Sequence, residues 1–225
     1  MIHQWNHEHR WMAFGCDLLL GVGADRKTDY QQQQFLPDTL RKDFANAVVV
    51  EPSGRTHKLV AATLYPLTPN NAEENSGFWS IVSPTVFFAI IFILSLVISF
   101  FEYRRKKICW PYDTLLLTAS GLAGIILFLM IFSQHPTVRV NLQILLLNPL
   151  SIIFVFAVSR KACHHQLHFY WNILFVCLIL FLVCGLFLQK YAEGMWLLAC
   201  TLLVRTIINR LLYQKPVTHK IGNNQ

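Results

Sequence analysis

Five long apolar stretches between residues 84 and 212 constrain this chain more than any other feature of its sequence. A hydrocarbon core of about 30 Å requires about 20 mostly apolar residues in a helix, and each stretch meets or approaches that length. A large soluble helical core would show polar stripes at helical spacing, whereas these stretches are apolar on every side. The fold predicted is mainly α, a polytopic five-helix membrane bundle with helices over residues 84–101, 113–133, 142–159, 172–188 and 192–212.

Basic residues are distributed unevenly between the two ends of these stretches. Lys and Arg are retained on the cytoplasmic side in loops close to helix ends. Arg139 and Lys190 lie at one end, and the other end collects Arg104, Arg105, Lys106, Lys107, Arg160, Lys161, Arg210, Lys215 and Lys220. This distribution predicts a multi-pass membrane protein whose N-terminus lies outside the cytoplasm and whose C-terminus lies inside it. Arg205, inside the fifth stretch, is expected to extend its long side chain to the cytoplasmic interface.

The charge balance indicates which partners the chain has, and the cysteines indicate whether it contains a disulfide or metal framework. The 225 residues carry a formal net charge of +7, and the positive charge gathers at one membrane face. Anionic lipid accounts for such a distribution, so we expect membrane lipids and no nucleic acid as partners. The six cysteines form no CxxC pair and mostly fall within or beside apolar stretches, which favours small core residues over a disulfide or metal framework. No cofactor is expected.

The positions of the acidic residues bear on whether the chain is a transporter. Glu102, Asp113 and Glu193 all lie at the borders of the apolar stretches. Proton-coupled and sodium-coupled transporters usually require a carboxylate inside the membrane, and many show inverted repeats. Neither feature is visible in the sequence, which disfavours a transporter.

Residues 1–77 differ from the rest of the chain and predict a small α+β extracytoplasmic segment ending in a linker at 68–77. One helix, capped by Thr28, is expected from about Asp29 onwards, and a second over 38–44. Strands over 45–50 and 56–65 flank a turn at 51–54 and form a hairpin candidate. Residues 1–11 are polar and show no basic region followed by an apolar run, so they are not expected to be a signal peptide. Either the first membrane helix acts as a reverse anchor or the chain is the tail of a longer precursor, and we favour the second.

The histidines at positions 3, 7 and 9 have no evident fourth partner, so no metal site is expected. Residues 78–215 form the membrane domain and 216–225 a cytoplasmic tail.

The loop between the second and third predicted helices is the candidate site for lipid or substrate contact. Its candidate residues are His135, Pro136, Arg139, Asn141, Asn148 and Pro149. Asn148 would lie about 9 Å into the third helix at 1.5 Å per residue, where Pro149 kinks the helix and frees carbonyl groups. Asn148 then either joins neighbouring helices or belongs to a polar notch that receives a lipid head group or acyl ester.

Two glycines of the second helix, Gly121 and Gly124, leave one of its faces without bulky side chains. Small residues at this spacing let a neighbouring helix backbone approach closely, and a lipid chain could approach in the same way. Helix packing is the more common outcome.

Several motifs together resemble the Lnb-type lipoprotein N-acyltransferases of Bacteroides and relatives. The sequence FGCDLLLG at 14–21, Ala24 to Arg26, Gln34 to Pro37 and the hairpin ending at Leu64 and Tyr65 resemble the end of their periplasmic domain. The loop with His135-Pro136, Asn141 and Asn148-Pro149 resembles that of their five-helix membrane domain. The resemblance spans nearly the whole chain. It implies a multi-pass protein of the bacterial inner membrane with a periplasmic N-terminus and a cytoplasmic C-terminus.

The resemblance implies acyl transfer to the N-terminal cysteine of lipoproteins through a thioester on an exported Cys/His domain. That domain would precede residue 1, so no catalytic residue is assigned in this chain and its status as an enzyme is left open. The expected function is to present phospholipid or lipoprotein at the periplasmic face to that upstream domain. The alternative is a non-catalytic inner-membrane anchor or assembly protein.

Overall fold

The computed structural model describes residues 9–25, 29, 37–64, 82–135 and 137–213. The chain forms two compact units, one built from residues 1–25 and 77–225 and the other from residues 26–76. The candidate site lies in the first unit.

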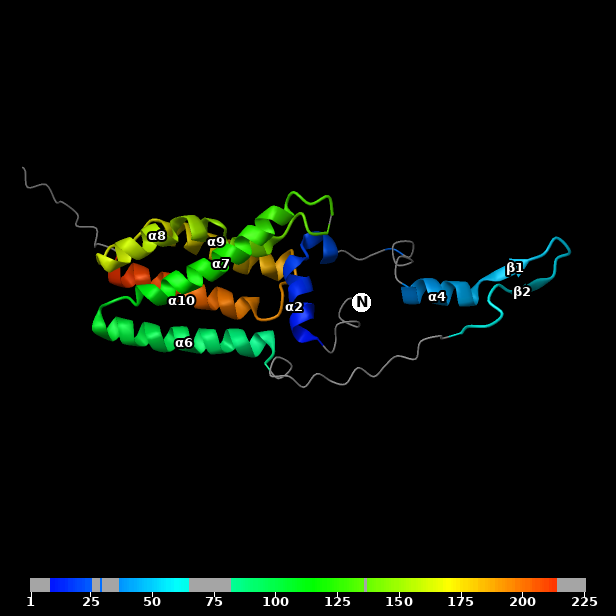
Figure 1. The fold of residues 1–225 in the computed structure, drawn as a ribbon, viewed down its shortest axis with the longest axis horizontal. Coiled ribbons are helices and arrows are strands. Elements are labelled where there is room, and N and C mark those ends of the chain that lie inside the picture. Colours follow the sequence, from blue (N-terminus) through cyan, green and yellow to red (C-terminus); the bar gives the residue numbers. More distant parts are fainter. Residues whose placement is uncertain (1–8, 26–28, 30–36, 65–81, 136, 214–225) are drawn as a thin grey trace, which may run out of the picture. The chain divides into compact units, whose positions relative to one another are not determined.

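The first unit is a bundle of long antiparallel helices (Figure 1). Five spans are long and apolar enough to cross a membrane, with η2 and α8 counted together as one. The predicted mainly α, five-helix bundle is therefore confirmed. Its elements are α6 (Pro84–Arg105), α7 (Trp110–Met130), η2 (Leu142–Leu145), α8 (Leu150–Cys163), α9 (Tyr170–Phe187) and α10 (Met195–Tyr213).

Local sequence signals explain the bounds of α6. The hydroxyl oxygen of Ser83 accepts a hydrogen bond from Val86 N at 3.3 Å, and Pro84 occupies the first helical turn. A Ser cap followed by Pro is a common helix start, because the cap satisfies one free N–H and Pro has none to satisfy. At the other end, Lys106 adopts the left-handed conformation with φ of 54° and terminates the helix.

The third span is broken rather than continuous. The sequence predicted one helix over 142–159, kinked at Pro149, whereas the short helix η2 ends at Leu145 and α8 begins at Leu150. Irregular backbone at membrane depth requires internal hydrogen-bond partners. Asn148 supplies one, because its side-chain oxygen accepts from Leu150 N at 2.9 Å, and Leu147 N donates to Gln143 O at 2.9 Å.

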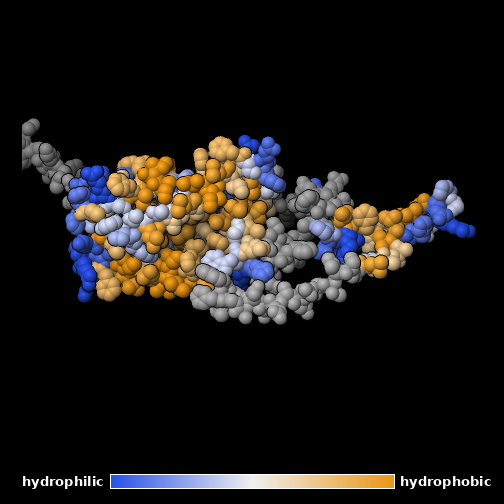
Figure 2. All heavy atoms as spheres, in the orientation of Figure 1, coloured by the Kyte–Doolittle hydropathy of each residue, from blue (hydrophilic) through white to orange (hydrophobic). Residues whose placement is uncertain are grey.

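The core of the bundle lies along one face of α9. Tyr170, Leu174, Leu178 and Phe181 follow one another at helical spacing and are fully buried. Buried residues of α7, α8 and α10 surround this face. The outside of the bundle is largely hydrophobic, and hydrophilic residues collect at its ends (Figure 2), as expected for helices that face lipid.

The second unit contains α4 (Pro37–Asn46) and two short antiparallel strands, β1 (Val48–Val50) and β2 (Thr56–Lys58). Val50 pairs with Thr56 across a turn in which Gly54 has φ of 81°, a conformation that favours glycine. The predicted short helix and hairpin are both present, but the strands are shorter than the predicted 45–50 and 56–65. The expected helix around 31–34, the linker at 68–77 and the histidines at positions 3 and 7 lie outside the described residues.

Candidate functional site

A helix that the sequence did not predict, α2 (Arg10–Leu19), lies across one end of the bundle (Figure 1). We call this end the α2 end. The indole N–H of Trp11 donates to Val82 O at 2.7 Å, just before α6. Trp11 also contacts Phe87 with ring centroids 5.6 Å apart, and Phe14 contacts Phe88 at 5.8 Å. Aromatic contacts at these separations are attractive beyond the area that they bury, so they fix the N-terminal half of α2 against α6.

Two buried amides of the η2 segment hold the other end of α2. Asn141 Nδ2 donates to Leu18 O at 2.7 Å, and Gln143 Nε2 donates to Asp17 O at 2.9 Å. The last carbonyls of a helix have no partner within the helix, and these side chains provide one. Gln143 Oε1 also accepts from Ala192 N at 3.2 Å and thereby reaches the connection between α9 and α10.

A third buried amide, Gln189, closes this network. Its oxygen accepts from Leu142 N at 2.7 Å, while its Nε2 donates at 3.0 Å both to Leu20 O and to Asn141 Oδ1. Asn141, Gln143 and Gln189 are 7%, 0% and 4% exposed. We refer to these three residues as the amide cluster. Because buried polar groups are costly unless paired, the cluster specifies one arrangement of α2, η2 and the connection between α9 and α10.

Backbone hydrogen bonds from the residues after α2 also hold this segment against the loop before η2. Gly21 N donates to Thr137 O and Val22 N to Val140 O, both at 2.8 Å. A Cβ atom at Gly21 would lie 2.0 Å from Val140 O, so only glycine permits this approach. Asp25, at the end of η1 (Val22–Asp25), accepts from Lys190 N at 2.7 Å through its carboxylate.

A second group of polar side chains, three charged and two uncharged, lies inside the bundle. The guanidinium of Arg205 on α10 donates to both carboxylate oxygens of Glu102 on α6, with Nη2 and Oε1 2.8 Å apart. Its Nε donates to Asp113 of α7 at 2.6 Å and its Nη1 to Ser99 at 2.9 Å. Asn209 Nδ2 donates to the other oxygen of Asp113 at 2.8 Å. We call these five residues the charge cluster.

Comparison with protein-family models gives a match to the Lnb transmembrane domain over residues 73–216. The chain belongs to the Lnb transmembrane domain family. The match covers all five spans, and it confirms the resemblance to an Lnb-type membrane domain. The motifs at 14–65 lie before the matched residues. Comparisons with curated proteins and with solved structures gave no match.

The expected lipid-contacting residues of this Lnb transmembrane domain that the structure describes lie in three places. Asn141 belongs to the amide cluster, whereas the side chains of His135 and Arg139 are exposed in the loop before it. Pro136 lies outside the described residues. Asn148 and Pro149 lie at the break before α8, where Asn148 is 8% exposed and bonded to Leu150 N. Asn148 thus pairs with the first N–H of α8, and its Nδ2 lies 3.7 Å from Cys177 Sγ of α9.

The two glycines of α7 face the start of α8 in this domain. A Cβ at Gly121 would lie 2.6 Å from Ile152 N, and one at Gly124 would lie 2.3 Å from Leu147 O. Both glycines therefore allow close backbone packing of α7 on the broken third span, which is the role expected for small residues in membrane helices.

Two features of the α2 end were missed from the sequence. Trp11, Phe14 and Leu18 follow helical spacing, but Gly15 and Gly21 and the polar first residues concealed the helix. Gln189 stands alone at the end of an apolar stretch and carries no motif. An amide bordering a membrane helix is the weak signal that could have indicated it.

The charge cluster corrects two expectations about this domain. Arg205 does not extend to the interface; it is fully buried and turned inward. Glu102 and Asp113 lie near helix ends as expected, but they are 4% and 3% exposed and face the bundle interior. Carboxylates are therefore present within the spans, contrary to the sequence interpretation. Within the described residues, no group of three or more His, Cys, Asp or Glu side chains could hold a metal ion.

Proposed function

We propose that this Lnb-type domain is the membrane part of a lipoprotein N-acyltransferase, and that its α2 end presents phospholipid or lipoprotein to a separate Cys/His domain. The observation that carries the proposal is the docking of α2 by the amide cluster. A membrane domain that only anchored its partner could use a flexible connection. A rigid connection fits a function in which an extramembrane group must meet a lipid ester at a defined place.

The distribution of charge supports a periplasmic α2 end. The opposite end, which we call the basic end, carries Arg104, Arg105, Lys106, Lys107, Arg160, Lys161 and Arg210 among the described residues. Basic residues near helix ends favour the cytoplasmic side. The α2 end would then face the compartment in which lipoproteins are acylated.

The chemistry proposed for the complete enzyme has two steps. A cysteine thiolate of the Cys/His domain attacks the ester carbonyl of a phospholipid, and the lysophospholipid leaves as the alcohol after protonation by the histidine. The free amine of the lipoprotein then attacks the thioester, gives an amide and returns the thiolate. The exposed loop residues His135 and Arg139 would contact the donor phosphate at the α2 end.

The test is the N-terminal mass of a lipoprotein in a host deficient in lipoprotein acylation. The host expresses this chain alone or joined to the coding sequence that naturally precedes it. We expect the mass of one acyl chain to appear only with the joined form. If neither form adds the mass while both are present in the membrane, the acyltransferase proposal is overturned in favour of an anchor or assembly protein.

Loop variants of the joined form test the proposed contact. We expect His135→Ala and Arg139→Ala to reduce acylation about tenfold, whereas the neighbouring exposed Gln134→Ala leaves it unchanged. Equal acylation in all three variants would remove the loop from the proposal.

A further inference from the structure

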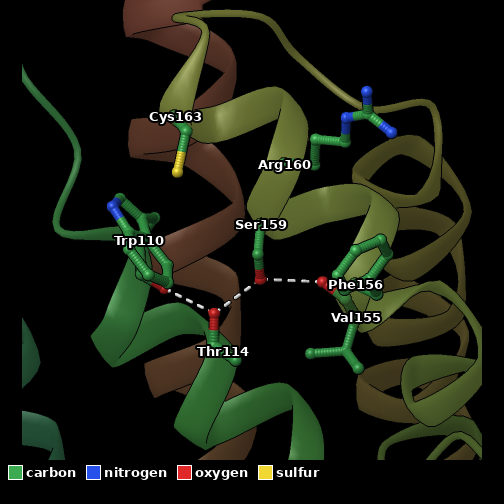
Figure 3. Close-up of a pocket in the computed structure, with 7 residues that line it drawn as sticks. All are labelled: Trp110, Thr114, Val155, Phe156, Ser159, Arg160 and Cys163. Carbon is green, nitrogen blue, oxygen red and sulfur yellow. Dashed lines mark hydrogen bonds between the residues drawn. The ribbon is translucent and has the colours of Figure 1, made fainter.

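A groove opens on the lipid-facing side of α7 and α8, close to the basic end and at the opposite end of the third span from the amide cluster. It has a volume of about 380 Å³, within the range of about 300–1,000 Å³ common for ligand clefts. Its lining residues are Trp110, Thr114, Val155, Phe156, Ser159, Arg160 and Cys163 (Figure 3).

The polar groups at the floor of the groove are satisfied by one another. Thr114 Oγ1 lies 2.8 Å from Trp110 O and 2.6 Å from Ser159 Oγ, which lies 2.8 Å from Val155 O (Figure 3). Two hydroxyl protons serve these three contacts, so no donor remains for a ligand. The groove therefore offers an apolar surface, which suits a hydrocarbon chain better than a polar head group.

The rim of the groove has the opposite character. Arg160 lies one turn before the end of α8, and its guanidinium extends away from Trp110 toward that end (Figure 3). The side chain of Arg160 is exposed. Trp110, at the start of α7, is 39% exposed, and Trp is the residue typical of the head-group level of a membrane.

We propose that this groove is a binding site for one anionic phospholipid, with an acyl chain between α7 and α8 and the phosphate on Arg160. Charge complementarity identifies the occupant: the groove surface is apolar, and the one charged residue among those that line it, Arg160, is a cation. A basic residue next to the head group increases the affinity for an anionic lipid about fivefold. This site is independent of the acyl donor proposed for the α2 end.

Native mass spectrometry of the purified full chain tests the proposal. Phosphatidylglycerol and phosphatidylcholine with identical acyl chains are added in equal amounts, and the first lipid adduct is quantified for each. We expect phosphatidylglycerol to be preferred, and Arg160→Gln to lower this preference about fivefold. The matched variant Arg105→Gln removes an exposed basic residue of α6 that does not line the groove and should change the preference less than twofold.

A second pair of variants tests the groove itself. Val155→Trp fills the groove and should reduce the first phosphatidylglycerol adduct, whereas Ile153→Trp adds the same bulk at a 65% exposed position of α8 outside it. Equal binding of the two lipids by the natural chain would overturn the proposal. So would equal effects of Arg160→Gln and Arg105→Gln, or of Val155→Trp and Ile153→Trp.

Discussion

Arg205 and Glu102 form a two-point ion pair between α10 and α6 with contacts of 2.5 and 2.8 Å, and both residues are buried. Asp113 binds the same guanidinium from α7 at 2.6 Å. One side chain therefore joins three of the five spans. A buried pair of this kind contributes little net stability relative to apolar residues, but removing one partner leaves an uncompensated charge.

We expect Arg205→Met to destabilise the bundle by about 3–5 kcal/mol, because Glu102 and Asp113 would remain buried without their cation. In a chain of this size the melting temperature should fall by roughly 10 °C. Thermal unfolding of the purified protein in detergent measures the change. Arg105→Met is the matched control, since Arg105 is exposed on α6 and should change stability by less than about 0.5 kcal/mol.

The triple variant Arg205→Met, Glu102→Gln, Asp113→Asn separates charge from packing. Neutralising the two carboxylates should recover most of the stability lost in Arg205→Met, because no charge is left unpaired. A triple variant no more stable than Arg205→Met would show that the packing of the arginine side chain, rather than its charge, holds the three helices.

Close packing of α7 on the third span gives a second prediction. Gly124→Ala places a methyl group 2.3 Å from Leu147 O and 2.7 Å from Pro149 N, both rigid backbone atoms. We expect a loss of about 1–3 kcal/mol from overpacking, measured by thermal unfolding in detergent. Gly15→Ala in α2 is the control, because a Cβ there meets nothing within 4 Å and alanine is the better helix former. Equal melting temperatures for the two variants would contradict the close approach.

The amide cluster gives a third prediction, about the mobility of α2. Asn141→Leu removes one of the two donors to Leu18 O and one of the two acceptors of Gln189 Nε2, and it leaves Gln143 N without its acceptor, Asn141 Oδ1. A buried group left unpaired costs about 1–3 kcal/mol. We expect faster amide hydrogen exchange in α2 and little change in α9. The exposed Gln134→Leu should leave exchange in α2 unchanged. Unaltered exchange in Asn141→Leu would show that the amide of Asn141 does not hold α2.

The sequence predicted the bundle well and its internal contacts poorly, for physical reasons. Hydropathy depends on the composition of each span alone, so the five spans could be found without knowing their neighbours. The partner of Arg205 depends on which face of α10 turns inward, and a single arginine among apolar residues fits either snorkelling or an internal ion pair. The α2 helix was missed because its stability comes from Trp11, Phe14 and the amide cluster rather than from local propensity.

Cysteine labelling tests the orientation of the domain. In spheroplasts, a membrane-impermeant maleimide should label Ser53→Cys, in the exposed turn between β1 and β2, in a background without other cysteines. The exposed natural Cys163, kept as the single cysteine, should react only after the membrane is opened, because it ends α8 at the basic end. The reverse labelling pattern would place the α2 end in the cytoplasm and remove the support for a periplasmic function.

The loop between α8 and α9 gives a pH-dependent prediction. His168 is 5% exposed, and its Nδ1 accepts a hydrogen bond from Tyr170 N at the start of α9 at 3.1 Å. Burial, with a smaller contribution from the charge of Lys161, lowers the pKa of His168 below its usual value of about 6.5. Protonation would also abolish the acceptor on Nδ1, so the folded state requires the neutral ring.

The direction of the effect follows from the order in which the two states take up a proton. As the pH falls through about 6.5, the unfolded chain protonates His168 before the folded chain does, so the bundle loses stability. His168→Asn keeps an acceptor near the position of Nδ1 and removes the titration. We expect the melting temperature of the natural chain to fall more between pH 7.5 and 5.5 than that of His168→Asn. Parallel pH profiles for the two proteins would mean that the ring of His168 remains accessible to protons in the folded state.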